Sequence, residues 1–231
     1  MRPGCGPDSP RYSRQIPLLG AEGQERLSRS TVAVVGLGGL GSTVSLYLAA
    51  AGVGRLVLVD GDRVEDGNLN RQILYDEASI GLPKPFIAAR RIRLLNSCVE
   101  TVPVHEWVTR DNADRILGEA DLVVDALDNW SGRLVLDEYT ERTGKPLVHG
   151  AVERLYGQVM LVVPGGPRLR AIAPGGEKRG VIPVTAPAVG VIASLEAELA
   201  VEALLGDYTR AGRLYIVDLR LMDIQSVELR S

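Results

Sequence analysis

The chain is poor in cysteine: only Cys5 and Cys98 occur among its 231 residues. They lie far apart in the sequence, and neither they nor His105 and His149 show the spacing of metal ligands. We therefore expect neither a disulfide scaffold nor a cysteine-based metal site, and a reducing cytosol is the simplest location. For Cys98, buried packing is the expected role.

The chain also lacks a basic excess and a long uninterrupted apolar run. Its net charge of −3 argues against a general nucleic-acid binder. The most apolar stretch, 186–205, contains Glu196, Glu198 and Glu202, which argues against a membrane span. Residues 1–10 are rich in Pro and Gly, so we expect a mobile arm and no signal peptide. These absences favour a soluble, cytoplasmic protein.

Aromatic residues are scarce, with a single Phe, so the core must consist mainly of Leu, Val, Ile and Ala. This composition suits parallel strands that are buried on both faces. The pattern predicts a strand at 31–35, a glycine turn, a helix at 42–51 and a strand at 55–59. That succession is typical of the opening of a Rossmann-type α/β fold.

The rest of the pattern predicts one domain over 1–231 with a mostly parallel sheet flanked by helices. Further helices are expected at 21–30, 84–96, 111–118 (capped by Asp111), 131–143 and 187–205. Strands are expected at 100–104, 122–126, 146–150 and 157–163, and an antiparallel C-terminal hairpin at 213–219 and 224–229. Residues 164–183 are predicted to form a long crossover loop, with a short strand at 169–173. The apolar helix at 187–205 is expected in the core or at a subunit interface.

The glycine turn predicts a nucleotide site. Gly36, Gly38 and Gly41 match G-x-G-x-x-G, and Gly39 adds a further residue without a side chain. Glycines let the backbone approach a phosphate, and the start of the next helix offers free N–H groups to an anion. Asp60 ends the next strand, where it is placed to bind ribose hydroxyls. The same pattern fits NAD and ATP equally well, or a turn that only packs a helix on a strand.

Three charged residues follow the strands and favour ATP. Arg71, Lys84 and Asp128 are all expected at the carboxyl ends of parallel strands, where open α/β sheets bind ligands. Adenylation places charge on the α-phosphate and on pyrophosphate, which cations and Mg²⁺ stabilise. Singly, each has a plain alternative: Arg71 and Lys84 as solvated residues, and Asp128 as a helix cap.

Taken together, these motifs resemble the MoeB/ThiF/HesA adenylyltransferases, relatives of the ubiquitin-activating enzymes. The resemblance runs from about residue 11 to the C-terminal hairpin and rests on segments 11–15, 36–41, 60–62, 68–72, 81–84, 128–129 and 189–195. It implies ATP- and Mg²⁺-dependent adenylation of the C-terminal glycine of a small ubiquitin-like sulfur carrier ending in Gly-Gly, with release of pyrophosphate. It also implies a homodimer with one ATP site per subunit.

The resemblance assigns a role to each motif residue. Asp60 would hold the ribose, Asn68, Arg71 and Lys84 the phosphates, and Asp128 the Mg²⁺, while Arg14 would reach into the partner's site. The remaining nucleotide contacts would come from Gly36, Gly38, Gly39, Gly41, Asp62, Gln72 and Asn129.

Two departures from relatives limit what can be carried over. Many relatives bind structural zinc through two C-x-x-C pairs, and this chain has none, so we expect no zinc. Some relatives hold a reactive cysteine in the crossover loop, which is cysteine-free here, so a covalent carrier intermediate is not expected. No rhodanese-like segment follows Ser231, so we expect sulfur to come from a separate protein.

Two alternatives remain open. The same site could adenylate a small carboxylate, a peptide terminus or a modified tRNA base. In a different class, the chain could be an NAD-binding oxidoreductase or regulator. That class leaves Arg71, Lys84 and Asp128 unexplained, and neither His105 nor His149 lies in a recognisable proton-donor motif.

Overall fold

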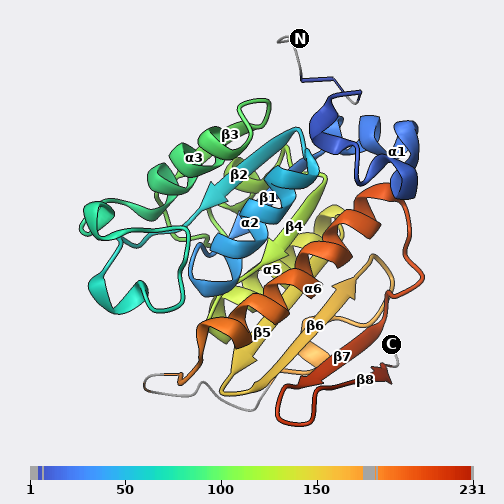
Figure 1. The fold of residues 1–231 in the computed structure, drawn as a ribbon. Helices are drawn as coiled ribbons and strands as arrows, with labels where there is room; N and C mark the ends of the chain where they lie inside the picture. Colours follow the sequence, from blue (N-terminus) through green and yellow to red (C-terminus); the bar gives the residue numbers. More distant parts are fainter. Residues whose placement is uncertain (1–4, 7, 174–179, 181, 230–231) are drawn as a thin grey trace.

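The fold is an eight-stranded sheet with helices on both faces, as the computed structural model in Figure 1 shows. The structure describes residues 5–6, 8–173, 180 and 182–229. The strand order is β3-β2-β1-β4-β5-β6-β7-β8. The strands are β1 (Thr31–Val35), β2 (Arg55–Val59), β3 (Glu100–Val104), β4 (Leu122–Asp125), β5 (Leu147–Glu153), β6 (Tyr156–Val162), β7 (Arg213–Asp218) and β8 (Asp223–Glu228).

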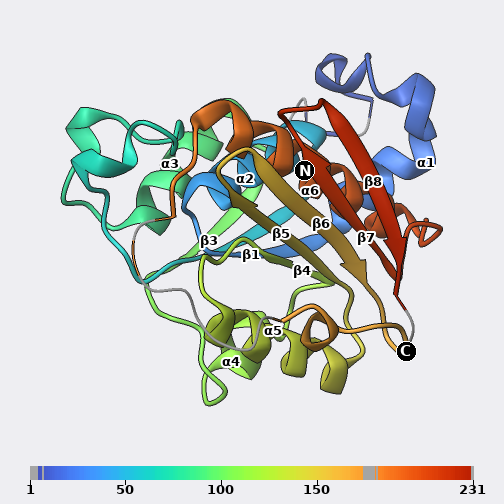
Figure 2. The ribbon, with the colours of Figure 1, turned by 90° about the horizontal axis from the view of Figure 1, so that it is seen from below.

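The helices connect and cover these strands. The α-helices are α1 (Ile16–Arg29), α2 (Gly39–Ala51), α3 (Lys84–Leu95), α4 (Ala113–Leu117), α5 (Trp130–Thr143) and α6 (Ala186–Leu205). Short 3-10 helices are η1 (Pro10–Tyr12), η2 (Asp66–Asn68), η3 (Glu77–Ser79) and η4 (Leu169–Ala171). In Figure 2, α2, α3 and α6 lie on one side of the sheet, and α4 and α5 lie on the other.

The sheet divides into a parallel part and an antiparallel part. Strands β3, β2, β1, β4 and β5 are parallel, whereas β5 to β8 pair antiparallel. In the parallel part, Val35 pairs with Val59 on one side and with Asp125 on the other. The strands β1, β2 and β4 are buried along most of their length, which explains their continuous Val and Leu runs.

The predicted fold class is confirmed, and so are the C-terminal hairpin and every predicted strand except 169–173, within a few residues. Four local predictions were wrong. Helix α1 begins earlier than expected because the chain resumes a helix across a kink at Gly20, which has φ +74°. Helix α2 begins at Gly39, inside the glycine motif. Asn112, and not Asp111, precedes α4. In place of the expected strand at 169–173, the chain forms the 3-10 helix η4 over Leu169–Ala171, with Leu169 buried in the core.

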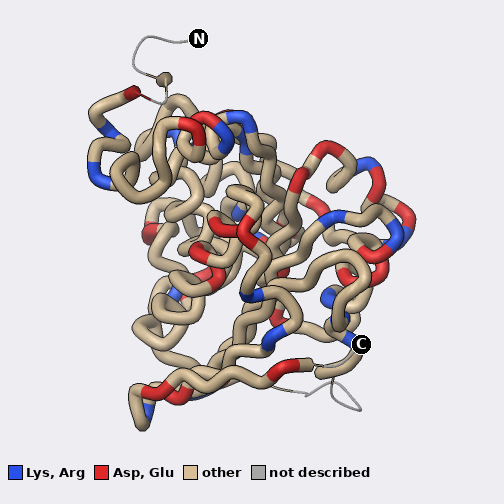
Figure 3. The backbone as a smooth tube through the Cα atoms, turned by 90° about the vertical axis from the view of Figure 1, so that its right-hand side faces the viewer, with Lys and Arg blue, Asp and Glu red and all other residues tan. Residues whose placement is uncertain are grey.

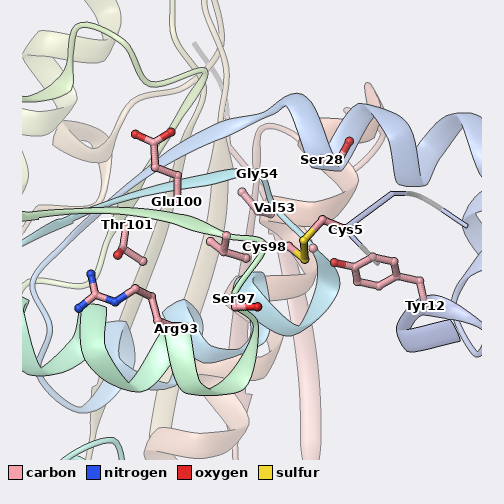
Figure 4. A pocket seen from close by; sticks show the side chains of 12 residues that line it. Cys5, Tyr12, Ser28, Val53, Gly54, Arg93, Ser97, Cys98, Glu100 and Thr101 are labelled. Atoms are coloured by element: carbon pink, nitrogen blue, oxygen red, sulfur yellow. A yellow bond between two sulfur atoms is a disulfide. The ribbon is translucent and has the colours of Figure 1, made fainter. Parts of the chain in front are cut away.

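The two cysteines form a disulfide, so the expectation that they would not pair was wrong. Cys5 is bonded to Cys98 with a Cα–Cα distance of 5.3 Å and a sequence separation of 93. The pairing arises because the segment before α1 folds across the ends of α2 and α3. Figure 4 shows the disulfide beside Tyr12, next to a cavity of about 490 Å³.

The same N-terminal segment is held by hydrogen bonds. Tyr12 is buried, and its hydroxyl accepts from Asn96 Nδ2 at 3.1 Å. Gln15 and Gln24 both donate to the carbonyl of Ala51, at the end of α2. The predicted mobile arm, 1–10, therefore has a fastened part at Cys5, whereas residues 1–4 and 7 lie outside the described residues.

Among the residues that the structure describes, no helix is both long enough and apolar enough to cross a bilayer. Even α6, the most apolar, lies against α2 and the strands β5 and β6 within the core, with its Ala and Ile side chains buried.

Candidate functional site

The candidate site lies where the strand order reverses. From β1 the chain moves outward to β2 and β3, and then returns to β4 on the other side of β1. Ligands of open α/β sheets bind at such a reversal, at the carboxyl ends of the strands. The glycine turn follows β1, and the segment 127–129 follows β4, so both lie at this point.

The glycine turn is closely packed and leaves no room for side chains. Gly36 has φ +88°, and a Cβ there would lie 2.6 Å from the carbonyl oxygen of Ala126. A Cβ at Gly41 would lie 1.8 Å from the carbonyl oxygen of Gly36. Helix α2 begins at Gly39 without a side-chain cap. Its first N–H groups are thus free to receive an anion, as a phosphate-binding turn requires.

Asp60 links the glycine turn to β2. Its Oδ2 accepts from the amide of Leu37 at 2.7 Å, and its Oδ1 accepts from the amide of Asp62 at 2.7 Å. Burial raises the pKa of Asp60, whereas Lys84 opposes the rise. The carboxylate is therefore fixed beside the turn, where the sequence predicts ribose binding.

Lys84 is a buried cation at the same edge. It is only 4% exposed, and its Nζ lies 3.1 Å from Asp62 Oδ2. The amide of Lys84 also donates to the carbonyl of Asp62. The structure therefore brings together Asp60, Asp62 and Lys84, as predicted. A buried lysine with an exposed carboxylate partner can exchange that partner for a phosphate.

Two further predicted residues lie beside the turn. Gln72 is 3% exposed, its Oε1 has no hydrogen-bond partner, and its Nε2 lies 3.6 Å from the place of a Cβ on Gly38. A buried unsatisfied oxygen next to a bare glycine turn fits a site that a polar ligand completes. Arg71 lies with its Cγ 3.8 Å from the place of a Cβ on Gly39.

Arg71 and Asn68 bind nearby residues within the part of the chain that the structure describes. Arg71 Nη1 donates to the carbonyl of Gly67 at 2.9 Å and to Asn70 Oδ1 at 3.0 Å. Asn68 Oδ1 accepts from the amide of Glu65, which caps η2. These contacts stabilise the 3-10 turn and leave further guanidinium donors of Arg71 able to bind a phosphate.

Asp128 and Asn129 follow β4 on the other side of the turn. Asp128 is exposed, and its Oδ1 accepts from Asn129 Nδ2 at 3.3 Å. The residue that caps α5 is Asn129, whose Oδ1 accepts from the amide of Gly132 at 2.8 Å. Asp128 is thus not the helix cap, and its carboxylate oxygens suit the hard Mg²⁺ ion, which keeps few protein ligands beside phosphate and water.

Arg14 does not lie beside the glycine turn. It is exposed and precedes α1, whereas Gln15 contacts Ala51, at the end of α2 opposite the glycine turn. Helix α2 has 13 residues, which separates its two ends by roughly 18 Å. In Figure 1, α1 lies at the far end of the strands from the start of α2.

Sequence reasoning missed two residues that pack on the segments after β1 and β2. Tyr75 is buried and donates from its hydroxyl to the carbonyl of Leu37 at 2.8 Å. Burial raises the pKa of Tyr75, so its hydroxyl keeps the proton that it donates. Trp107 covers Gly61, where a Cβ would lie 2.4 Å from the indole ring. Neither residue belongs to a motif, so no sequence signal could have identified them.

Within the residues that the structure describes, no group of three or more His, Cys, Asp or Glu side chains is arranged to hold a metal. The absence of zinc stays a prediction. His105 is half-buried, and His149 is fully buried behind the 127–129 segment.

Comparisons with known proteins identify the family of the chain. The model of the ThiF family matches residues 12–231. The chain is 39% identical over 230 residues to the SAMP-activating enzyme E1 of Haloferax volcanii, covering 96% of this chain and 85% of that protein. It is 43% identical over 223 residues to the sulfur carrier protein adenylyltransferase of Thermus thermophilus, covering 90% and 82%.

A solved structure of E. coli MccB with MccA-N7isoASN has the same fold, with a TM-score of 0.87 and 22% identity over 97% of this chain and 73% of that one. By the match to its family model and by its relatives, the chain belongs to the ThiF family.

Proposed function

We propose that the protein is an adenylyltransferase that uses ATP and Mg²⁺ to adenylate the C-terminal glycine of a small ubiquitin-like sulfur carrier. The observation that carries the proposal is the joint placement of the glycine turn, Asp60, Lys84 and Asp128 at one point of strand reversal. The names of the two relatives, a SAMP-activating enzyme and a sulfur carrier protein adenylyltransferase, support the carrier as the substrate.

The chain's own residues would act on ATP by binding and orientation. Asp60 would accept from the ribose hydroxyls, while the free N–H groups of α2 would bind phosphate oxygens. Arg71 and Lys84 would stabilise the charge that develops on the α-phosphate and pyrophosphate. Asp128 would hold Mg²⁺, which supplies charge neutralisation between phosphate oxygens. In-line attack by the carrier carboxylate then forms the acyl-adenylate and releases pyrophosphate.

We also propose a homodimer in which Arg14 completes the partner's site. The support is its place at the far end of the strands, where it cannot reach its own site. Mixing Arg14→Ala with Arg71→Ala subunits tests this arrangement. Each variant alone should be inactive, while the mixture should recover about a quarter of the wild-type rate, because half of the dimers then hold one intact site. A mixture as inactive as its components contradicts it.

The cytosolic location, the separate sulfur donor and the absence of a covalent cysteine step stay predictions. The Cys5–Cys98 disulfide is an observation against a reducing compartment. Acidic and basic positions are mixed along the backbone in Figure 3, and the net charge is −3, which favours a protein substrate over tRNA.

Pyrophosphate–ATP exchange, with Mg²⁺ and with or without small proteins ending in Gly-Gly, tests the function. Carrier-dependent exchange is the expected result. Exchange that depends on a small carboxylate or an RNA, and not on a carrier, would mean that the substrate belongs to that other class. Preferential binding of NAD over ATP, without exchange, would overturn the proposal.

A further inference from the structure

A cluster of buried polar side chains lies directly behind the segment that carries Asp128. It is formed from β4, β5, β6, α5 and α6 by Asp125, His149, Gln158, Arg133 and Glu196. Asp125, His149 and Glu196 are each 0% exposed. Buried polar groups of this number are costly unless they are paired, so their pairing indicates what the cluster does.

His149 connects Gln158 to Asp125. His149 Nδ1 lies 2.7 Å from Asp125 Oδ2, and His149 Nε2 lies 3.0 Å from Gln158 Nε2. An amide nitrogen can only donate, so His149 Nε2 accepts and the ring proton lies on Nδ1. Burial lowers the pKa of His149, which keeps the ring neutral. His149 is therefore a neutral donor to the carboxylate of Asp125.

Asp125 and Arg133 in turn hold Leu127 on both sides. Asp125 Oδ1 accepts from the amide of Leu127 at 3.2 Å. Arg133 Nη2 donates to the carbonyl of Leu127 at 2.5 Å, and Arg133 Nε lies 3.7 Å from Asp125 Oδ2. The carbonyl of Leu127 belongs to the same planar peptide as the amide of Asp128. Fixing that carbonyl fixes the start of Asp128.

Glu196 leaves the charge balance of this cluster unchanged. Among the described residues, neither of its oxygens has a hydrogen-bond partner, and burial raises its pKa well above the ordinary value, which favours its protonated, uncharged form. The cluster then contains one carboxylate, Asp125, and one guanidinium, Arg133. With His149 absent, Asp125 Oδ2 would lose its short hydrogen bond, and the carboxylate would turn toward Arg133.

We propose that His149 is a positioning residue for Asp128, acting through Asp125 and the two hydrogen bonds to Leu127. The inference rests on the proposed function, in which Asp128 binds Mg²⁺. Removing a residue that orients a metal ligand through hydrogen bonds typically changes metal affinity or activity by 10- to 100-fold. His149 acts one step further back: it contacts Asp125, and Asp125 and Arg133 bind Leu127, the residue before Asp128.

The first test measures positioning itself, by hydrogen exchange of the amides of Leu127 and Asp128 in the full chain. His149→Phe removes the donor and fills the space of the imidazole ring. If Phe is not accommodated there, His149→Leu is used in place of His149→Phe. His149→Asn keeps a donor nitrogen bonded to Cγ, in the place of Nδ1. Val148→Ala is the matched control, because Val148 is equally buried and faces the other side of the sheet.

We expect His149→Phe to speed exchange at Leu127 by about tenfold, which corresponds to the loss of about 1.4 kcal/mol of local hydrogen-bond stability. His149→Asn should stay close to wild type, and Val148→Ala should not change these amides selectively. Equal exchange at Leu127 in His149→Phe and Val148→Ala would overturn the inference.

The second test measures the Mg²⁺ concentration that gives half-maximal pyrophosphate exchange. This Mg²⁺ concentration should rise by about tenfold in His149→Phe and should equal the wild-type value in His149→Asn. The KM for the carrier should stay unchanged in both variants. An unchanged Mg²⁺ dependence contradicts the inference. Should the wild type catalyse no exchange, the proposed function fails, but the hydrogen-exchange result still decides whether His149 positions this segment.

Discussion

The two ends of the parallel strands are built for different tasks. At the carboxyl end, the partners of Arg71 and Asp128 among the described residues lie within four positions in the sequence, and Gln72 has an oxygen that none of these residues satisfies. At the amino end, a disulfide and the buried Tyr12–Asn96 hydrogen bond tie the N-terminal segment to α2 and α3. One end leaves polar groups available for a ligand, whereas the other end uses a covalent bond and internal hydrogen bonds to hold a segment in place.

The disulfide provides the largest expected effect on the amino end. The Cys5→Ser, Cys98→Ser double variant should lose about 4.5 kcal/mol of unfolding free energy, because the bond closes a loop of 93 residues. Denaturant unfolding measures this loss, and a dithiol reductant should destabilise the wild type but not the variant. The exchange rate of the folded variant should stay near wild type. A loss of activity without a loss of stability would remove the contrast between the two ends.

Arg71→Ala and Asp128→Ala should lower activity and keep stability, which is the reverse of the effect expected for the cysteine variant. Each should lower the pyrophosphate exchange rate by 10²- to 10³-fold, as removal of a transition-state charge partner does, with little change in stability. Arg90→Ala is the control, because Arg90 is exposed on α3 and faces no site residue. An exchange rate in Arg71→Ala equal to that of Arg90→Ala would contradict the role of the carboxyl end.

The buried Glu196 makes the unfolding free energy of the protein depend on pH. Burial raises its pKa well above 4.5, so the folded chain keeps a proton that the unfolded chain loses above about pH 4.5. The unfolding free energy should therefore fall as pH rises from 4.5 to the raised pKa, by up to about 1.4 kcal/mol per pH unit.

Glu196→Gln should remove this slope and stabilise the protein at neutral pH. Glu198→Gln is the control, since Glu198 is exposed on the same helix. Denaturant unfolding at several pH values measures both. A slope that persists in Glu196→Gln would mean that another group releases the proton.

Tyr12→Phe tests the smallest effect at the amino end. It removes the hydroxyl that accepts from Asn96 Nδ2 and should cost about 1 kcal/mol of unfolding free energy. Tyr47→Phe is the matched control, because Tyr47 is half exposed. Thermal or denaturant unfolding compares the stabilities of the two variants. Equal stabilities would show that this hydrogen bond does not contribute to holding the N-terminal segment.

The two ends also differ in how much the sequence predicted. The glycine turn, Asp60 and Lys84 were predicted because each lies in a motif whose meaning is local: a strand end, a turn, a helix start. The pairing of Cys5 with Cys98 was not, because it depends on how the N-terminal segment docks on α2 and α3. Sequence separation carries no information about such docking.

The same reason explains what was missed inside the site. His149 lies in no motif, and its role depends on Asp125 and Gln158, which come from neighbouring strands. Tyr75 binds Leu37 across 38 residues of sequence. Contacts between distant segments decide both, whereas the residues that would touch phosphate cluster near strand ends and were identified from the pattern.

The central claim is tested most directly by giving the protein ATP labelled in the α-phosphate together with Mg²⁺ and a carrier ending in Gly-Gly. The label should appear on the carrier as an acyl-adenylate, and Arg71→Ala should abolish it. Binding of ATP with no label on any carrier would contradict carrier adenylation at this site.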